Sequence, residues 1–362
     1  MKIKKIITFA SCALLAFNML YAQAQTESLE ENNIEENTEL ESNEEGSEEN
    51  FVTKTEEASE NKSFFDSLKY AISADFAFYP KSDYVAGGTH FAPLTGIYSG
   101  LEGRVTGSAT YVIPTPLGEN WLLKDANVAL KASLELTPVS IKPGFSATFT
   151  PLPFLVFAAG GEAGTGWNLL GLQGMASYDG TSSYTDITPF TSWFLKAWAQ
   201  GTVQFDTGAL IPGDWSHVVM LFTYQVYYQN LTGVSSGEIW EWQCSKNKAD
   251  GFNQYMCGVL AYQMPLVLKR VGVMFEMEGH FADSDYNTSK YADYNGNFQS
   301  ISISPLAQFE FDKHNSLSVL IGFSSRRSYE ESHTDDAVEP NLTYAGREWY
   351  FNRVAVSYTY SF

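Results

Sequence analysis

From residue 67 to its last residue, the chain alternates apolar with small or polar side chains at a period of two. This period is typical of β-strands whose two faces meet different surroundings. The runs extend from LKYAISADFAF (68–78) to WYFNRVAVSYTYSF (349–362), and they predict about 12 strands of roughly 9–15 residues. Ordinary globular strands have about 5–6 residues, whereas a tilted strand that crosses a membrane needs about 9–11. The pattern therefore predicts an all-β chain whose strands are long enough to cross a membrane.

The connections between these runs alternate between long and short along most of the chain. The segment TPLP (150–153) is short, for example, and the next connection, 167–190, is long. Membrane barrels have this asymmetry, with short turns on the periplasmic side and long loops outside. Two connections break the rule, because TPVS (137–140) is short where a long loop is expected and 114–125 is long where a turn is expected. An even number of strands places both ends of the barrel on one side, which we expect to be the periplasm.

The chain ends in NRVAVSYTYSF, in which the alternation continues to the final aromatic residue. A strand in lipid must pair all of its backbone N–H and C=O groups, and a closed barrel does this without an open edge. We therefore expect the last strand to pair with the first. The ending resembles the assembly signal of Gram-negative-type outer-membrane β-barrel proteins of the porin-like kind, without indicating a subfamily. The resemblance implies that the barrel-assembly machinery recognises this strand through Tyr358, Tyr360 and Phe362. The alternative is an edge strand of a soluble sheet that ends on Phe.

The start of the chain predicts export. MKIKK is a basic segment, IITFASCALLAFNML is apolar, and AQA before Gln25 fits the cleavage rule of a signal peptide, although a lipoprotein anchored at Cys12 is an alternative. No later run approaches the ~20 apolar residues of a membrane helix. We therefore predict a signal peptide (1–24), a disordered Glu-rich periplasmic arm (25–64) and a transmembrane antiparallel up-and-down β-barrel of about 12 strands (65–362), located in the outer membrane.

The arm owes its predicted disorder to its charge. Residues 25–62 contain 14 glutamates and two lysines, and the formal net charge of the chain is -20. So few apolar residues cannot offset the entropy lost on ordering. The alternative is that the arm recruits cations or a basic partner. The negative charge also argues against nucleic-acid binding, since it would repel phosphates.

The composition supports the barrel. The chain contains 25 Phe, 21 Tyr and 8 Trp, yet its mean hydropathy is only -0.18. A helical membrane protein would be far more apolar. Trp193 and Trp215 are among the tryptophans that fall near predicted strand ends, where such rings lie at the level of the lipid headgroups.

If the apolar face of each strand contacts lipid, the other face lines the interior. So many charged and polar residues suggest a hydrated pore for small hydrophilic solutes, and the acids outnumber the bases, which favours a mild preference for cations. The alternatives are a salt-bridged barrel that conducts nothing and a surface-exposed structural or adhesive barrel whose long loops bind external molecules. A homo-oligomer is compatible with the sequence, because faces that contact lipid or another subunit look alike. The predicted pore-lining residues are Asp75, Glu102, Arg104, Lys131, Glu135, Glu162, Lys196, Glu276, Glu278, Glu310, Arg326 and Arg353.

Catalysis is not expected. His280 and His333 have aspartates nearby in sequence, but long acidic loops produce such pairs by chance, and no third orienting group can be placed. After removal of the signal, Cys244 and Cys257 remain; they could form a disulfide in an oxidising compartment or stay free. No cofactor or metal site is predicted, because no Cys-x-x-Cys motif or histidine cluster accompanies them.

Overall fold

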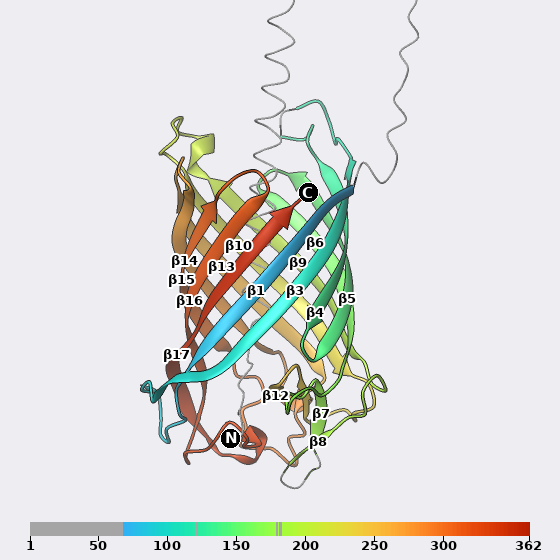
Figure 1. Cartoon of the computed structure of the whole chain (residues 1–362), viewed down its shortest axis with the longest axis vertical. Helices are drawn as coiled ribbons and strands as arrows, with labels where there is room; N and C mark the ends of the chain where they lie inside the picture. The colour runs from blue at the N-terminus through green and yellow to red at the C-terminus, as the bar shows by residue number, and fades with distance from the viewer. Residues whose placement is uncertain (1–67, 121, 179, 181–182) are drawn as a thin grey trace, which may run out of the picture. The chain divides into compact units, whose positions relative to one another are not determined.

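The computed structural model describes residues 68–120, 122–178, 180 and 183–362. Twelve long strands pair antiparallel with their neighbours in sequence order, and the last pairs with the first, so the sheet closes into a barrel (Figure 1). The predicted all-β barrel of about 12 strands is confirmed. The predicted signal peptide and acidic arm lie outside the described residues. The barrel strands are β1 (Leu68–Lys81), β3 (Gly96–Pro114), β4 (Asn127–Thr137), β5 (Ser140–Leu152), β6 (Leu155–Gly166), β9 (Phe194–Asp206), β10 (Val218–Leu231), β13 (Gly251–Gln263), β14 (Leu268–His280), β15 (Ser300–Glu310), β16 (Asn315–Tyr329) and β17 (Tyr344–Ser361).

The final strand closes the barrel, as its pattern predicts. It lies between β16 and β1, and its register with β1 places Val356 opposite Phe76 on the outer face and Ser357 opposite Asp75 on the inner face. The backbone N–H of Phe362 donates to the carbonyl of Tyr70 at 3.0 Å. Both edges of the last strand are therefore hydrogen-bonded.

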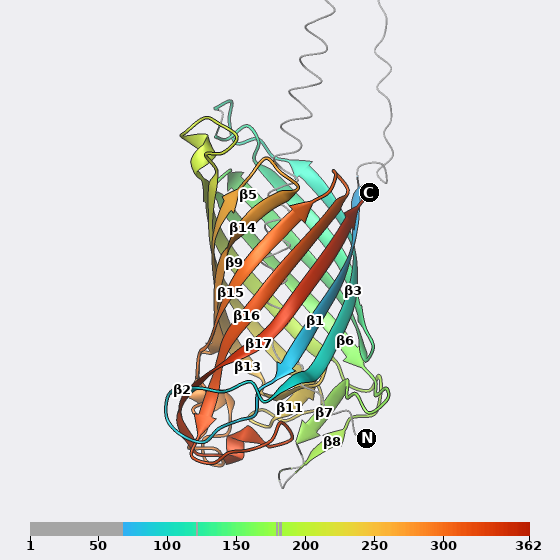
Figure 2. The same cartoon turned by 60° about the vertical axis from the view of Figure 1, so that its left-hand side comes forward.

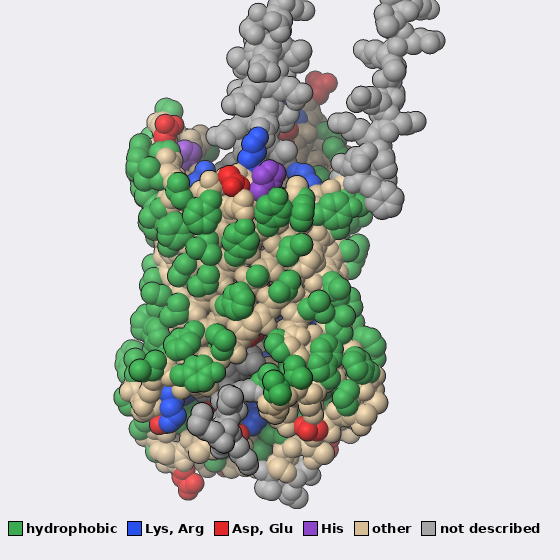
Figure 3. All heavy atoms as spheres, in the orientation of Figure 1, with side chains coloured by type: hydrophobic (Ala, Val, Ile, Leu, Met, Phe, Trp, Pro, Cys, Tyr) green, Lys and Arg blue, Asp and Glu red, His purple; other side chains and the backbone are tan. Residues whose placement is uncertain are grey.

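The outer face of the barrel is apolar. Figure 3 shows hydrophobic side chains spread over the wall, with charged side chains near its two ends. Phe76 is 55% exposed and Phe145 is 57% exposed, values that suit contact with hydrocarbon rather than with water. Trp193 and Trp215 are also exposed, each a few residues before the strand that follows it. Among the described residues, no helix is long and apolar enough to span a membrane.

The two ends of the barrel differ. At the terminal end, where β1 begins and β17 ends, the connections include the tight turns 153–154 and 311–314. At the opposite end, called the loop end, they are long, except for the turn 138–139 between β4 and β5. The two exceptions to the alternation of long and short connections are both present. The turn 138–139 is short although it lies at the loop end, and the segment 115–126 between β3 and β4 is long although it lies at the terminal end.

The long loops contain structure that the two-residue period does not predict. A separate four-stranded sheet, which we call the cap, lies at the loop end in the order β12-β11-β7-β8 (Figure 2). A further short strand, β2, pairs in parallel with β17. These elements are β2 (His90–Phe91), β7 (Met175–Tyr178), β8 (Tyr184–Asp186), β11 (Trp240–Trp242) and β12 (Ser245–Lys248), with short 3-10 turns at Thr207–Ala209, Asp283–Asp285 and Glu339–Asn341.

We expect Val356→Arg to destabilise the barrel, because Val356 faces outward between Phe76 and Val319. A basic side chain on the lipid face lowers the free energy of unfolding by about 2–4 kcal/mol near the bilayer centre. Urea unfolding in phospholipid vesicles, followed by tryptophan fluorescence, measures this change. Thr359→Arg on the inner face of the same strand is the control, and an equal loss of stability in both variants would contradict the assignment of faces.

Candidate functional site

A chain of ion pairs crosses the inner wall from β1 to β6. Arg104 on β3 lies 3.1 Å from both Asp75 and Glu135, measured between guanidinium nitrogens and carboxylate oxygens. Lys142 on β5 continues the chain, with its Nζ 3.4 Å from Glu135 and 3.0 Å from Glu162. Alternating charges on neighbouring strands stabilise one another where an isolated charge would be costly. We call these five residues the charge ladder.

On the opposite wall, tyrosine hydroxyls donate hydrogen bonds to the carboxylates. The hydroxyl of Tyr255 donates to Glu276 at 2.9 Å, and that of Tyr227 donates to Glu278. The ammonium of Lys196 lies over the ring of Tyr227, 4.1 Å from its centroid. The aromatic residues of the interior therefore orient its charged groups.

All of the predicted pore-lining residues lie on barrel strands. Glu310 and Arg326 lie near opposite ends of the wall, and the others occupy inward-facing positions along it. Two further buried bases, Lys142 and Arg270, were not among the predicted residues. Lys142 lies in IKPGFSATF (141–149), a run that the pattern predicts as a strand, and its two-residue spacing from Ser140 could have identified its face. Arg270 falls in a segment that was expected to be a turn.

Glycines on β6 make room for the cap. A Cβ atom on Gly164 would lie 2.8 Å from the indole of Trp242, and one on Gly160 would lie 2.7 Å from the indole of Trp198. Trp242 also stacks on Phe194, with ring centroids 4.8 Å apart. Gly160 and Gly164 thus leave room for aromatic rings inside the barrel.

Hydrogen bonds fix the cap to the wall. The side-chain amide of Gln243 donates to Glu135 of the charge ladder at 3.1 Å and to Ser140 at 2.7 Å. Asp250 accepts from the indole N–H of Trp240 at 2.9 Å and from the backbone N–H of Leu231 at 3.0 Å. Burial raises the pKa of Asp250, while these donors favour its ionised form and act in the opposite direction. The cap is therefore a fixed part of the loop end.

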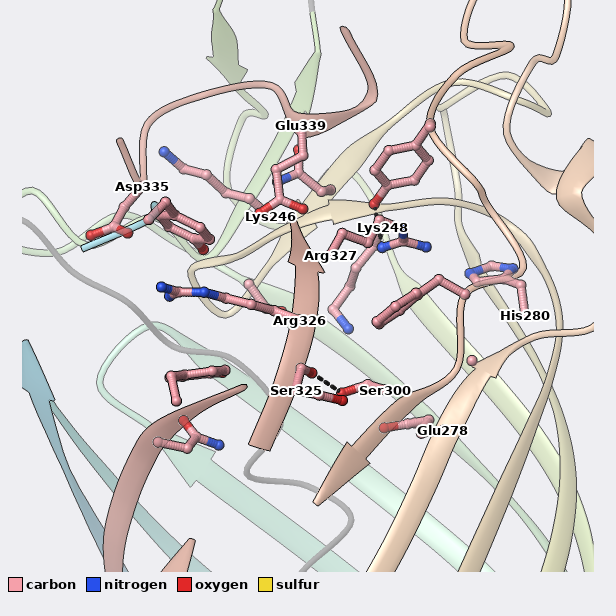
Figure 4. A pocket seen from close by; sticks show the side chains of 18 of the residues that line it. Lys246, Lys248, Glu278, His280, Ser300, Ser325, Arg326, Arg327, Asp335 and Glu339 are labelled. Carbon is pink, nitrogen blue, oxygen red and sulfur yellow. Dashed lines mark hydrogen bonds between the residues drawn. The ribbon is translucent and has the colours of Figure 1, made fainter. Parts of the chain in front are cut away.

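A cavity of about 160 Å³ lies between the cap and the wall (Figure 4). The guanidinium of Arg326 lies over Tyr84 and Tyr350, 3.6 and 4.3 Å from their ring centroids, and pairs with Glu348. Arg327 lies over the ring of Tyr294 and donates to its hydroxyl at 2.8 Å. Aromatic rings and paired charges thus surround the cavity. The residues with ionisable side chains that are labelled in Figure 4 are Lys246, Lys248, Glu278, His280, Arg326, Arg327, Asp335 and Glu339.

The five histidines lie next to carboxylates and backbone carbonyls. His280 pairs with Asp285 at 2.8 Å, and His333 stacks on Tyr84 and lies 3.8 Å from Glu339. No described hydroxyl or thiol side chain is hydrogen-bonded to any of the five imidazoles.

The cysteines do not pair. Cys244, in the turn between two cap strands, and Cys257, on the inner face of β13, are both buried, and neither forms a disulfide. The disulfide considered from the sequence is therefore absent. Cys244 instead contacts the carbonyl of Gln173 at 3.1 Å.

We expect Asp250→Ala to loosen the cap. The change leaves the N–H groups of Trp240 and Leu231 without their acceptor, and each unsatisfied buried group costs about 1–3 kcal/mol. Amide hydrogen exchange over residues 240–248 should become at least about tenfold faster, since about 1.4 kcal/mol is a factor of ten. Asp336→Ala is the control, because Asp336 is half exposed and pairs with Lys246 at the surface. Unchanged exchange in Asp250→Ala would exclude this role.

Comparisons with known proteins find similar folds only. No protein-family model and no curated protein matches the chain. Among solved structures it is similar to the KdgM porin, at 9% identity and a TM-score of 0.34, with 81% of this chain and 99% of that chain covered. It is also similar to the COG4313 outer membrane channel from Pseudomonas putida F1, at 8% identity and a TM-score of 0.42, with 82% and 96% covered. These likenesses identify no subfamily. The closed sheet, its apolar outer face and its charged interior are those of an outer-membrane β-barrel.

Proposed function

We propose that the protein is a porin-like channel that lets small hydrophilic solutes cross the outer membrane passively. The observation that carries this proposal is the inner wall of the closed twelve-stranded barrel, which is lined by charged and polar side chains such as those of the charge ladder. Twelve strands give a diameter between the filled eight-stranded barrels and the 16–18-stranded porins. The interior then has room for water and small molecules.

Passage would proceed by weak, repeated contacts. The charges of the ladder are paired, so none of them holds a solute tightly, and a solute can exchange contacts from one pair to the next. Lys142 and Arg270 add two bases to the interior, which offsets the excess of acids behind the expected cation preference. We therefore propose a channel with little charge selectivity along its wall.

The cap would set the size limit. It lies at the loop end, where Trp242 packs into the wall at Gly164 and Gln243 reaches Glu135. We propose that the loop end faces the exterior and the terminal end the periplasm, so that solutes meet the cap first. In the same proposal the machinery that assembles barrels recognises Tyr358, Tyr360 and Phe362, and copies of the barrel could associate through their outer faces.

The adhesive alternative has less support. In this alternative the long loops bind external molecules at the surface. Among the loop residues, Trp240 and Trp242 are the aromatic side chains best suited to such binding. Their exposed fractions are 0% and 4%, because both belong to the cap and pack against Phe194 of the barrel wall. Buried in this way, they stabilise the loops.

Purified protein in a planar lipid bilayer should give discrete conductance steps in potassium chloride. A channel whose interior is hydrated conducts small ions at any modest voltage. Protection of the strands from protease shows whether the protein has inserted. Inserted protein that gives no conductance would overturn the proposal.

We expect Gly164→Val to raise the single-channel conductance. A side chain at Gly164 overlaps the indole of Trp242, so the cap must move away from the wall. Gly161→Val is the matched control: Gly161 lies on the outer face of the same strand, and a Cβ there meets the carbonyl of Lys196 at an ordinary 3.5 Å. Equal conductance in both variants would show that the cap does not limit passage.

A further inference from the structure

The cavity beneath the cap is large enough for one small ring. Its volume is about 160 Å³, and a cavity of about 150 Å³ can hold a molecule of the size of benzene. It is lined by cap strand β12 and by residues of the barrel strands at the loop end, as the close view in Figure 4 shows. A ligand in such a pocket is selected by a few well-placed polar groups. The polar groups of the lining therefore indicate what the cavity can hold.

Three amide side chains in the lining have an unused oxygen. Asn253, Asn352 and Gln229 are each at most 6% exposed, and their side-chain nitrogens donate to protein oxygens at 3.1, 2.9 and 3.2 Å. Their side-chain oxygens accept no hydrogen bond from a described residue. Unlike the amide oxygens of Gln225 and Gln299, these three are not completely enclosed by protein. The cavity therefore offers three acceptors to a ligand.

Two hydroxyls and a carboxylate add to these acceptors. Tyr84 and Tyr350 hold the guanidinium of Arg326 between their rings, but neither hydroxyl is hydrogen-bonded to a described residue. A phenolic hydroxyl can both donate and accept. Asp335, which is half-buried in the same lining, makes no hydrogen bond or ion pair with a described residue. Most of the unused groups are thus acceptors.

The charges of the lining favour a neutral ligand. Of the four bases, Arg326 pairs with Glu348 and Lys246 with Asp336, so two remain against three acids. The positive charges repel a cation, and a ligand carboxylate, which only accepts, would lie against oxygens that also only accept. A neutral hydroxyl avoids both penalties, because it can donate to these oxygens. The bases and acids of the lining are Lys246, Lys248, Arg326, Arg327, Glu278, Asp335 and Glu339.

We propose that the cavity binds one ring of a neutral sugar. Its hydroxyls donate to the amide oxygens of Asn253, Asn352 and Gln229 and exchange hydrogen bonds with Tyr84 and Tyr350. This inference rests on the proposed channel function and names a class of solute for it. Since the cavity lies beneath the cap at the loop end, the sugar is bound where a solute would enter the barrel.

Titrations followed by saturation-transfer NMR can test the site, with the full chain in detergent and three sugars that share one ring. D-glucose is neutral, D-glucuronate carries a carboxylate and D-glucosamine carries an ammonium, at a pH where both of the latter are charged. We expect the native protein to bind glucose about tenfold more tightly than either charged sugar, the factor that about 1.4 kcal/mol produces.

Tyr84→Phe with Tyr350→Phe removes the two hydroxyls and keeps both rings beside Arg326. We expect this double variant to bind glucose about tenfold more weakly than the native protein, because two hydrogen bonds to the ligand are lost. Tyr344→Phe is the matched control. Tyr344 also lies at the loop end, where it packs against Phe298, but it does not line the cavity.

Equal binding of glucose by the double variant and the native protein would overturn this inference. Tighter binding of glucuronate or glucosamine, or no saturation transfer to glucose, would overturn it as well. Conductance in potassium chloride judges the channel separately. Protein that conducts but does not bind glucose contradicts the sugar site alone, whereas protein that binds glucose but never conducts contradicts the channel and leaves the site in place.

Discussion

Everything in this structure depends on satisfying the backbone of a sheet in a solvent that offers no hydrogen bonds. Hydrocarbon cannot pair with an exposed N–H or C=O group, so a membrane-spanning sheet must close. Here the last strand meets the first, with Ser357 opposite Asp75 and Val356 opposite Phe76. Closure fixes which side chains face lipid and which face inward, and it thereby creates the interior in which the charge ladder can exist.

The interior is not uniform, and its parts follow from side-chain size. Glycines on β6 leave space for Trp242 of the cap and for Trp198 of β9. The cap can therefore pack against the inner wall at the loop end. The ladder from Asp75 to Glu162 occupies one region of the wall, and the carboxylates held by tyrosines occupy the region across from it. One sheet therefore carries both the docked cap and two charged regions.

The sequence predicted the barrel well because one rule, the period of two, governs nearly every residue from Leu68 onward. Strand number, faces, the pairing of β17 with β1 and the alternation of connections follow from it. It could not predict the cap, since β11 and β12 are too short to show a period and depend on contacts with distant residues such as Phe194. The inward positions of most charged residues were predictable from spacing alone, but their partners were not, because pairing such as that of Lys142 with Glu162 depends on register.

The pairing of β1 with β17 also bears on how such a chain reaches its final form. Every other pairing in the barrel joins two strands that follow each other in the barrel order. Each of these pairings can form by adding one strand to an existing edge of the sheet. The closing junction instead joins Ala71 to Ser361, almost the whole described length of the chain. A loop of that size has a closure entropy of about 5 kcal/mol if the intervening chain is flexible, but much less once the other strands have curled the edges together. Synthesis of β17 therefore has to precede completion of the cylinder, and a nascent chain that lacks it would keep two unpaired edges open to other chains.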